Sequence, residues 1–193
     1  MSYDIELKDP VTKETIEIAE PHFMRGGTYA IGGTHELWLN ITYNYSHYYY
    51  EATDGDPRFA HDEVSCYYAD GTQGPIETQY GIRGIYGKTG AESVQMLKDM
   101  IWRIETEYKD KNGEWITTKR KKHRLLDPNG KVYECAFNAI INNLPRIGEE
   151  YEIEVNEGPN EDYWEPTAGN AIKPLYQLIA FAQMRPDGIW DGD

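Results

Sequence analysis

Cysteine is scarce in this chain of 193 residues, which contains only Cys66 and Cys135. The two cysteines are far apart, and neither belongs to a CxxC motif. Two cysteines are too few for the disulfide framework that stabilises small secreted proteins, so the composition indicates a reducing compartment. The N-terminus is charged from Asp4 onward and lacks the apolar core of a signal peptide. We therefore expect a cytoplasmic protein.

Long hydrophobic runs and an excess of positive charge are also missing. No segment of the sequence approaches the ~18 apolar residues of a transmembrane helix, so we expect no membrane contact. The formal net charge is −14, and an acidic surface is repelled by phosphate backbones, which disfavours direct nucleic-acid binding. The same charge is compatible with solubility or with a basic protein partner.

The chain has one basic run, at residues 119–124 (KRKKHR), and it does not change that expectation. Glutamates are concentrated further along the chain, at Glu149, Glu150, Glu152, Glu154 and Glu157. We predict that the two segments pair as neighbouring strands and neutralise each other. Contact between the basic run and nucleic acid is the alternative.

Recognisable catalytic and metal-binding motifs are absent from the sequence. The five histidines show no HxH or HExxH spacing, and there is no GxSxG motif. Residues 84–90 (GIYGKTG) resemble a P-loop, but that motif requires a glycine where the chain has Ile82. We predict no catalytic residue, no metal and no cofactor, and we favour a protein that is not an enzyme.

Alternation of apolar and polar residues predicts strands in both halves of the chain. The segments with this alternation or with similar strand character are residues 3–7, 15–19, 37–46, 114–118, 131–137 and 151–155. We expect residues 3–7 and 15–19 to form a hairpin around a turn at 9–13. Residues 51–80 show no sustained period and are rich in Asp, Gly, Thr and Gln, which predicts a long loop.

Helical periodicity predicts two main helices. In the first, apolar residues recur at spacings of three and four, at Val94, Leu97, Ile101, Ile104 and Tyr108. Thr89 and Glu92 form a capping-box pattern in front of them, so this helix should span about residues 90–108. The second should span about 170–184, because Pro174 favours a start at Asn170. We predict a single α+β domain over residues 1–193, with a mostly antiparallel sheet.

The strand expected at residues 37–46 has an unusual polar face. Asn40, Thr42 and Asn44 would share this face, whereas Tyr43 and Tyr45 would lie on the other. Solvent-exposed faces usually carry charged residues, so an uncharged polar face is expected to be sheltered. Sheltered amides and hydroxyls need hydrogen-bond partners. These partners are either an internal polar network or a ligand in a pocket.

Arg83 and Lys88 lie just before the start of the first predicted helix. A helix N-terminus presents unpaired N–H groups and a partial positive charge, which attract anions. The small residues Thr89 and Gly90 would let an anion approach. The alternative is that Thr89 and Glu92 satisfy those N–H groups themselves.

Several stretches of the chain resemble a family of small accessory proteins encoded by phages and prophages of bacteria. They are residues 40–46 (NITYNYS), 81–93 (GIRGIYGKTGAES), 163–170 (YWEPTAGN) and 185–193 (RPDGIWDGD). The resemblance leaves out residues 51–80 and 109–160. It implies the cytoplasm of a bacterial host cell and a role in binding, such as countering a host defence. It carries over no catalytic residue.

We therefore predict a phage accessory protein that sequesters a small anionic, nucleotide-like ligand. The expected ligand-binding residues are Arg83, Lys88, Thr89 and Gly90 for phosphate, Asn40, Thr42 and Asn44 for hydrogen bonds, Tyr43, Tyr45 and Trp164 for stacking, and Asn170 at the second helix start. One alternative is an acidic inhibitor that binds a basic host protein. Another is an enzyme that processes nucleotides or nucleic acid.

Overall fold

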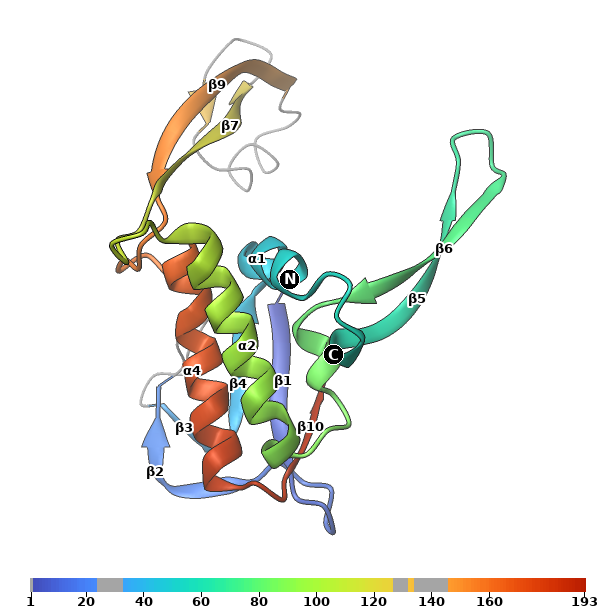
Figure 1. Cartoon of the computed structure of the whole chain (residues 1–193), viewed down its shortest axis with the longest axis vertical. Helices are drawn as coiled ribbons and strands as arrows, with labels where there is room; N and C mark the ends of the chain where they lie inside the picture. The colour runs from blue at the N-terminus through green and yellow to red at the C-terminus, as the bar shows by residue number, and fades with distance from the viewer. Residues whose placement is uncertain (1, 24–32, 127–131, 134–145) are drawn as a thin grey trace. The chain divides into compact units, whose positions relative to one another are not determined.

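The structure is a computed structural model that describes residues 2–23, 33–126, 132–133 and 146–193 (Figure 1). Antiparallel strands and helices occupy separate stretches of the chain, which confirms the α+β class. The chain divides into two compact units, whereas the sequence predicted one domain. The first unit combines residues 1–115 with 158–193, and the second consists of residues 116–157.

The first unit is built around a three-stranded antiparallel sheet with the order β10-β1-β4. β1 (Ser2–Lys8) lies in the middle, between β4 (Trp38–Thr42) and β10 (Ile189–Gly192). Burial alternates along β1, so that Tyr3, Ile5 and Leu7 face the core. This is the pattern of a sheet with one covered face.

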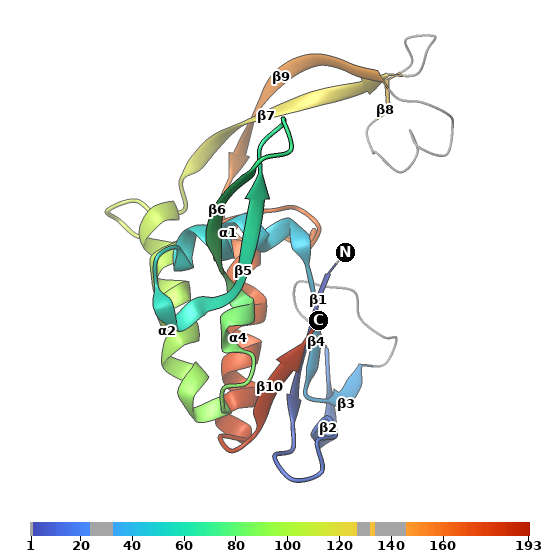
Figure 2. The same cartoon turned by 90° about the vertical axis from the view of Figure 1, so that its right-hand side faces the viewer.

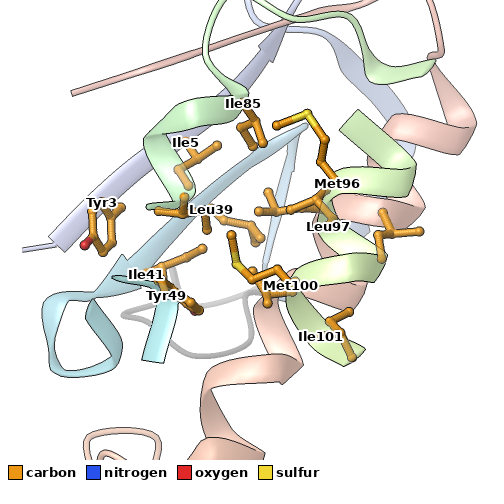
Figure 3. Close-up of a cluster of buried hydrophobic side chains, with 14 of the residues drawn as sticks. Tyr3, Ile5, Leu39, Ile41, Tyr49, Ile85, Met96, Leu97, Met100 and Ile101 are labelled. Carbon is orange, nitrogen blue, oxygen red and sulfur yellow. The ribbon is translucent and has the colours of Figure 1, made fainter. Parts of the chain in front are cut away.

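Helices cover the apolar face of this sheet (Figure 2). α2 (Gly90–Tyr108) and α4 (Ala168–Met184) lie side by side, and the shorter α1 (Ser46–Thr53) contacts both. Figure 3 shows side chains of α2 pointing toward apolar side chains of the sheet strands. The labelled members of this core are Tyr3, Ile5, Leu39, Ile41, Tyr49, Ile85, Met96, Leu97, Met100 and Ile101.

The two main helices start as capped helices. α2 spans the predicted residues, and its capping box is present, because the Thr89 side chain accepts from the Glu92 N–H and the Glu92 side chain accepts from the Thr89 N–H. α4 begins earlier than predicted, after the N-cap Thr167, so Pro174 lies inside the helix. The Tyr49 hydroxyl donates to the Ala171 carbonyl at 2.9 Å, which gives a carbonyl in the turn before the proline a partner.

The strand predicted at residues 37–46 is too long. β4 ends at Thr42, and the chain continues as a 3-10 turn, η1 (Tyr43–Tyr45), and then as α1. The Thr42 hydroxyl accepts from the Asn44 N–H and so caps the turn. Tyr45 is still buried, but it is buried by the helices rather than as part of the sheet.

The long loop predicted at residues 51–80 is wrong, because most of this segment forms regular secondary structure. After α1 and the short η2 (Pro57–Phe59), the chain forms a hairpin of β5 (Ala60–Tyr67) and β6 (Gln73–Tyr80). Most side chains on both strands are exposed, so no alternation of apolar and polar residues marks them. A further 3-10 turn, η3 (Ile82–Ile85), leads to α2.

The N-terminal strands pair mainly with partners other than each other. β1 pairs with β4 and β10, and β2 (Glu17–His22) pairs with β3 (Thr34–Glu36). The predicted hairpin is present only as a short contact around the turn, where Lys8 and Thr15 form an isolated bridge and the Ile16 N–H donates to the Leu7 carbonyl at 2.9 Å. Non-local pairing of this kind buries β1 on both edges.

The second unit is a three-stranded sheet with the order β8-β7-β9. β7 (Thr117–Leu126) carries the basic run, β9 (Arg146–Asn156) carries most of the glutamates, and β8 (Val132–Tyr133) is short. Most of the strand predicted at 131–137 lies outside the described residues. The predicted charge pairing is confirmed, with Lys119–Glu152 at 3.1 Å, Lys121–Glu150 at 2.8 Å and Arg120–Glu157 at 2.7 Å.

Candidate functional site

A cavity of about 390 Å³ in the first unit brings together two of the predicted ligand-binding residues, Arg83 and Lys88. It lies where the base of β5, the turn η3 and the end of β10 meet. The residues that line it are Ala60, His61, Asp62, Arg83, Gly84, Tyr86, Lys88, Gly192 and Asp193. Segments more than 100 positions apart in the sequence therefore form its wall.

Arg83 is held in place on η3 by several partners. Its Nε donates to the Asp193 carbonyl at 2.9 Å, and its Nη2 donates to the Tyr43 hydroxyl. The guanidinium carbon also lies 5.4 Å from the ring centroid of Tyr3 and 5.8 Å from that of Tyr43. Two contacts of this kind fix the orientation of a guanidinium. The Arg83 side chain also interacts with the Tyr86 hydroxyl.

Lys88 is fixed through its backbone rather than through its side chain. The Lys88 N–H donates to Ile85 at 3.0 Å, and the Lys88 carbonyl accepts from Trp190 at 2.9 Å. Gly87 precedes it with a φ of +76°, a conformation that glycine adopts without strain. Within the described parts of the chain, the half-buried Lys88 ammonium makes no hydrogen bond and no ion pair. It is a positive charge that a ligand can approach.

The other polar residues give the cavity a mixed character. Asp62 and Asp193 are exposed carboxylates, and the Asp193 side chain accepts from the Asp4 N–H at 2.9 Å. His61 is half-buried and contacts the Phe59 carbonyl through Nδ1 at 3.3 Å. Burial raises the pKa of Tyr86, so its hydroxyl stays protonated at neutral pH. The cavity therefore combines cations, carboxylates and an aromatic ring.

The helix N-terminus beside this cavity does not offer free donors. The Gly90 N–H donates to Gly188 at 2.8 Å, and the Ala91 N–H donates to Pro186 at 2.9 Å. The capping box uses the N–H groups of Thr89 and Glu92. Thr89 and Gly90 thus hold the start of α2 in place, and the self-capping alternative describes this helix correctly.

The polar residues of the 40–46 segment take part in an internal network. The Asn40 amide donates to the Ser2 hydroxyl and to the Asp4 carboxylate, both at 2.7 Å. Thr42 is buried and caps η1. Asn44 is exposed and donates to the Trp164 carbonyl at 2.7 Å. Of the two interpretations, the polar network rather than the pocket wall accounts for these residues.

Tyr45, Trp164 and Asn170 belong to a second internal network. The buried Tyr45 hydroxyl donates to the Tyr163 carbonyl, and Asn170 is fully buried among backbone and side-chain partners of residues 160–165. Trp164 is 49% exposed and packs against Tyr163 with ring centroids 4.8 Å apart. The predicted ligand-binding residues lie in three segments, 40–46, 83–90 and 164–170, and residues 40–46 link the other two. None of residues 40–46 or 164–170 lines the cavity.

Sequence reasoning missed His61, Asp62, Tyr86 and Asp193 as lining residues. Tyr86 lies in the same GIYGKTG stretch that contains Lys88, so its position was a usable signal. Nothing in the sequence signals Asp193, because it reaches the cavity through the pairing of β10 with β1.

Two further features bear on the class of protein. Among the described residues, no group of three or more His, Cys, Asp or Glu side chains is arranged to hold a metal ion. The helices in the described ranges also include none that is long and apolar enough to cross a membrane. Fold and site together define an α+β protein with a small polar cavity of mixed charge.

No protein-family model, curated protein or solved structure matches the chain. The resemblance to phage accessory proteins therefore stays a prediction.

Proposed function

We propose that the protein binds a small anionic, nucleotide-like ligand in the cavity formed by Arg83, Lys88 and Tyr86. The observation that carries this proposal is the Lys88 ammonium, which lines the cavity and makes no hydrogen bond or close ion pair among the described residues, although its charge also acts on Glu92. A half-buried ammonium is stabilised by an anion that binds next to it.

The chemistry of the cavity favours a phosphate-bearing ligand with a polar ring over a simple anion. Lys88 supplies a point charge, and the remaining Arg83 donors supply directional hydrogen bonds to phosphate oxygens. Asp62 accepts hydrogen bonds, as the amino groups of a base would require, and Tyr86 offers a ring for contact. The volume of about 390 Å³ falls in the range of about 300–1,000 Å³ that is common for small-molecule sites.

The biological role that we propose is sequestration. The resemblance of residues 40–46, 81–93 and 163–170 to phage accessory proteins supports a function in the host cytoplasm, where removal of a nucleotide signal would counter a defence. Binding without turnover is sufficient for that role.

The test is calorimetric titration of the purified protein with mono-, di- and cyclic nucleotides and with inorganic phosphate. Lys88→Gln should weaken binding by roughly 10- to 100-fold, because a hydrogen bond to a charged group contributes about 1.5–3 kcal/mol. Lys98→Gln is the matched control, since Lys98 is an exposed lysine of α2 that does not line the cavity. The affinity of the Lys98→Gln variant for the nucleotide should equal that of the wild type.

Equal affinity of Lys88→Gln and wild type would contradict the proposed site, and the absence of heat with every nucleotide would contradict the proposed ligand class. Chromatography of the nucleotides after incubation separates binding from the enzyme alternative. Recovery of intact ligand supports sequestration, whereas conversion that chelators abolish supports a metal-dependent enzyme.

A further inference from the structure

The hairpin of β5 and β6 has the composition of an interaction surface. Four of its large hydrophobic side chains are exposed, with Val64 at 45%, Tyr67 at 69%, Tyr68 at 61% and Ile76 at 61%. Figure 1 shows the hairpin reaching away from α2 and α4. Exposed apolar groups that are concentrated in one element mark a binding site more often than isolated ones do.

The pairing of the hairpin leaves both of its edges available. β5 and β6 form a two-stranded sheet, and no other strand of the described residues joins it. Each strand is eight residues long. Natural proteins usually protect such edges with lysine or proline. β6 contains Pro75, but β5 has neither residue along residues 60–67. β5 carries the charged Asp62 and Glu63, and its register shifts between Ala60 and Asp62 and between Ser65 and Tyr67. Its regular stretch is therefore residues 62–65, and along this stretch an extended segment can add as a further strand.

The charge of the hairpin determines what kind of segment fits. Residues 60–80 contain the acidic residues Asp62, Glu63, Asp70 and Glu77 and no lysine or arginine. A hairpin that carries exposed apolar and acidic side chains is complementary to a segment that carries apolar and basic side chains. A second copy of the chain would bring the same acidic hairpin and a net charge of −14, so self-association is opposed by repulsion.

From these observations we infer that the hairpin is a docking arm for another protein, and that it captures an extended segment rich in apolar and Lys or Arg residues along the edge of β5. Backbone hydrogen bonds to β5 would supply the affinity. The acidic residues Glu63 and Glu77, together with Val64 and Ile76, would select the sequence. The base of β5 also lines the cavity, at Ala60, His61 and Asp62, but neither these four residues nor Tyr67 do so.

The experiment uses the full chain and two fluorescent peptides, one of alternating lysine and valine and one of alternating glutamate and valine. Fluorescence anisotropy should detect binding of the lysine–valine peptide only. Raising the ionic strength from about 0.05 M to about 0.5 M should weaken this binding severalfold or more, because exposed charges are then screened. Hydrogen exchange should slow at the β5 amides on binding.

Two variants separate the arm from the overall negative charge. Glu63→Lys combined with Glu77→Lys should reduce the affinity for the lysine–valine peptide about tenfold or more. The control is Glu17→Lys combined with Glu20→Lys, which makes the same change of charge on β2 and should retain most of the binding. Ile76→Ser with Tyr67→Ser leaves the charge of the hairpin unchanged, gives a second test and should also weaken binding about tenfold.

Three outcomes would overturn the inference. The first is no binding of either peptide. The second is an equal loss of affinity in the hairpin pair and in the β2 control, which would mean that net charge alone attracts the peptide. The third is a concentration-dependent dimer of the wild type that Ile76→Ser and Tyr67→Ser abolish, which would make a second copy the occupant. Each of these leaves the nucleotide titration and the Lys88→Gln result unaffected.

Discussion

Asn170 is fully buried at the start of α4, and its side chain organises the segment before that helix. The amide nitrogen donates to Asn160 at 3.0 Å, to the Asp162 carbonyl at 2.9 Å and to the Glu165 carbonyl at 3.1 Å. Its oxygen accepts from the Asn160 N–H at 3.0 Å. Removal of the amide breaks four part-buried hydrogen bonds at once, which costs more than the loss of a single typical hydrogen bond.

We therefore expect Asn170→Ala to lower the free energy of unfolding by about 3 kcal/mol. Asn44→Ala is the matched control, because Asn44 is exposed and its side chain makes one hydrogen bond among the described residues, to the Trp164 carbonyl. It should cost about 1 kcal/mol or less. Urea unfolding followed by tryptophan fluorescence measures both. Equal effects of the two substitutions would show that Asn170 does not have this organising role.

Asp56 should give the first unit a specific dependence of stability on pH. Hydrogen bonds from Arg58, and then from Arg103, hold the pKa of the Asp56 carboxyl well below 3.8 against the opposing effect of burial. A carboxyl whose pKa is lower in the folded than in the unfolded state stabilises the fold above its unfolded pKa. That stabilisation is lost as the pH falls below 3.8 toward the folded pKa.

Asp56→Asn should therefore reduce the free energy of unfolding by about 2 kcal/mol at neutral pH. The difference from wild type should shrink as the pH falls below about 4. Asp54→Asn removes an exposed carboxylate from the same connection and should have little effect at either pH. Urea titrations at neutral and acidic pH supply the four values. A difference that is constant with pH would mean that the ionised carboxylate is not the stabilising group.

The site was predictable only where residues are neighbours in sequence. Arg83 and Lys88 flank the start of a helix whose capping pattern is readable, and both line the cavity. Asn40, Thr42 and Asn44 were recognised as sheltered or hydrogen-bonded groups, but sequence does not distinguish a protein partner from a ligand. Asp193 joins the cavity through long-range strand pairing, which local patterns do not encode.

At the level of elements, the turn η3 forms part of the cavity wall and packs against the turn η2 through a close approach at Gly84. A β-carbon on Gly84 would lie 2.3 Å from the Cα of Phe59, and this neighbour is backbone that cannot rotate away. Gly87 differs, because a β-carbon there would meet nothing within 4 Å, although its φ is +76°. Glycine is thus required at the two positions for different physical reasons. At Gly84 a side chain has no space, and at Gly87 the backbone conformation is left-handed.

Gly84→Ala should separate η2 from η3 and lower the free energy of unfolding by about 2–3 kcal/mol. Gly87→Ala should cost only about 1 kcal/mol, which is the strain of a left-handed alanine. Thermal unfolding ranks the two variants, and nucleotide titration shows whether the cavity survives. A Gly84→Ala variant as stable as Gly87→Ala would mean that the contact with Phe59 yields easily.

Helices and strands could be predicted from the sequence where each element buries one of its faces. α2 has an apolar stripe and a capping box, and its bounds agree with the prediction. The alternation of residues 37–46 continues past Thr42, because Tyr45 is buried by helices and so extends the apparent strand. The hairpin of β5 and β6 has no buried face, and a strand without one leaves no period in the sequence.

For the whole molecule, the division into two units places the apolar core in the first unit and a ladder of paired charges in the second. The buried apolar cluster consists only of residues from the first unit. In the second unit, β7 and β9 pair lysines with glutamates on exposed positions, and such pairs contribute little to stability. The sequence predicted this pairing but not the separate unit, because a charge ladder does not reveal which residues share a core.

The core of the first unit should therefore fold without residues 116–157. The connection is short, since the Glu157 N–H donates to the Ile116 carbonyl at 2.9 Å where the chain leaves and returns. We expect a variant that joins Trp115 to Gly158 through a short Gly-Asn-Gly linker to retain a cooperative unfolding transition. Its free energy of unfolding should differ from that of the first unit in the full chain by about 0.5 kcal/mol or less.

Tryptophan fluorescence makes this measurement selective, because every tryptophan lies in the first unit, at Trp38, Trp102, Trp115, Trp164 and Trp190. Glu152→Lys in the full chain is the companion variant. It places a third positive charge beside Lys119 and Lys121 in the second unit and should leave the tryptophan transition unchanged. A shortened chain that loses its cooperative transition, while Glu152→Lys shifts the transition of the full chain, would mean that the two units stabilise each other. An unchanged transition in both variants would assign the buried cluster alone as the source of the first unit's stability.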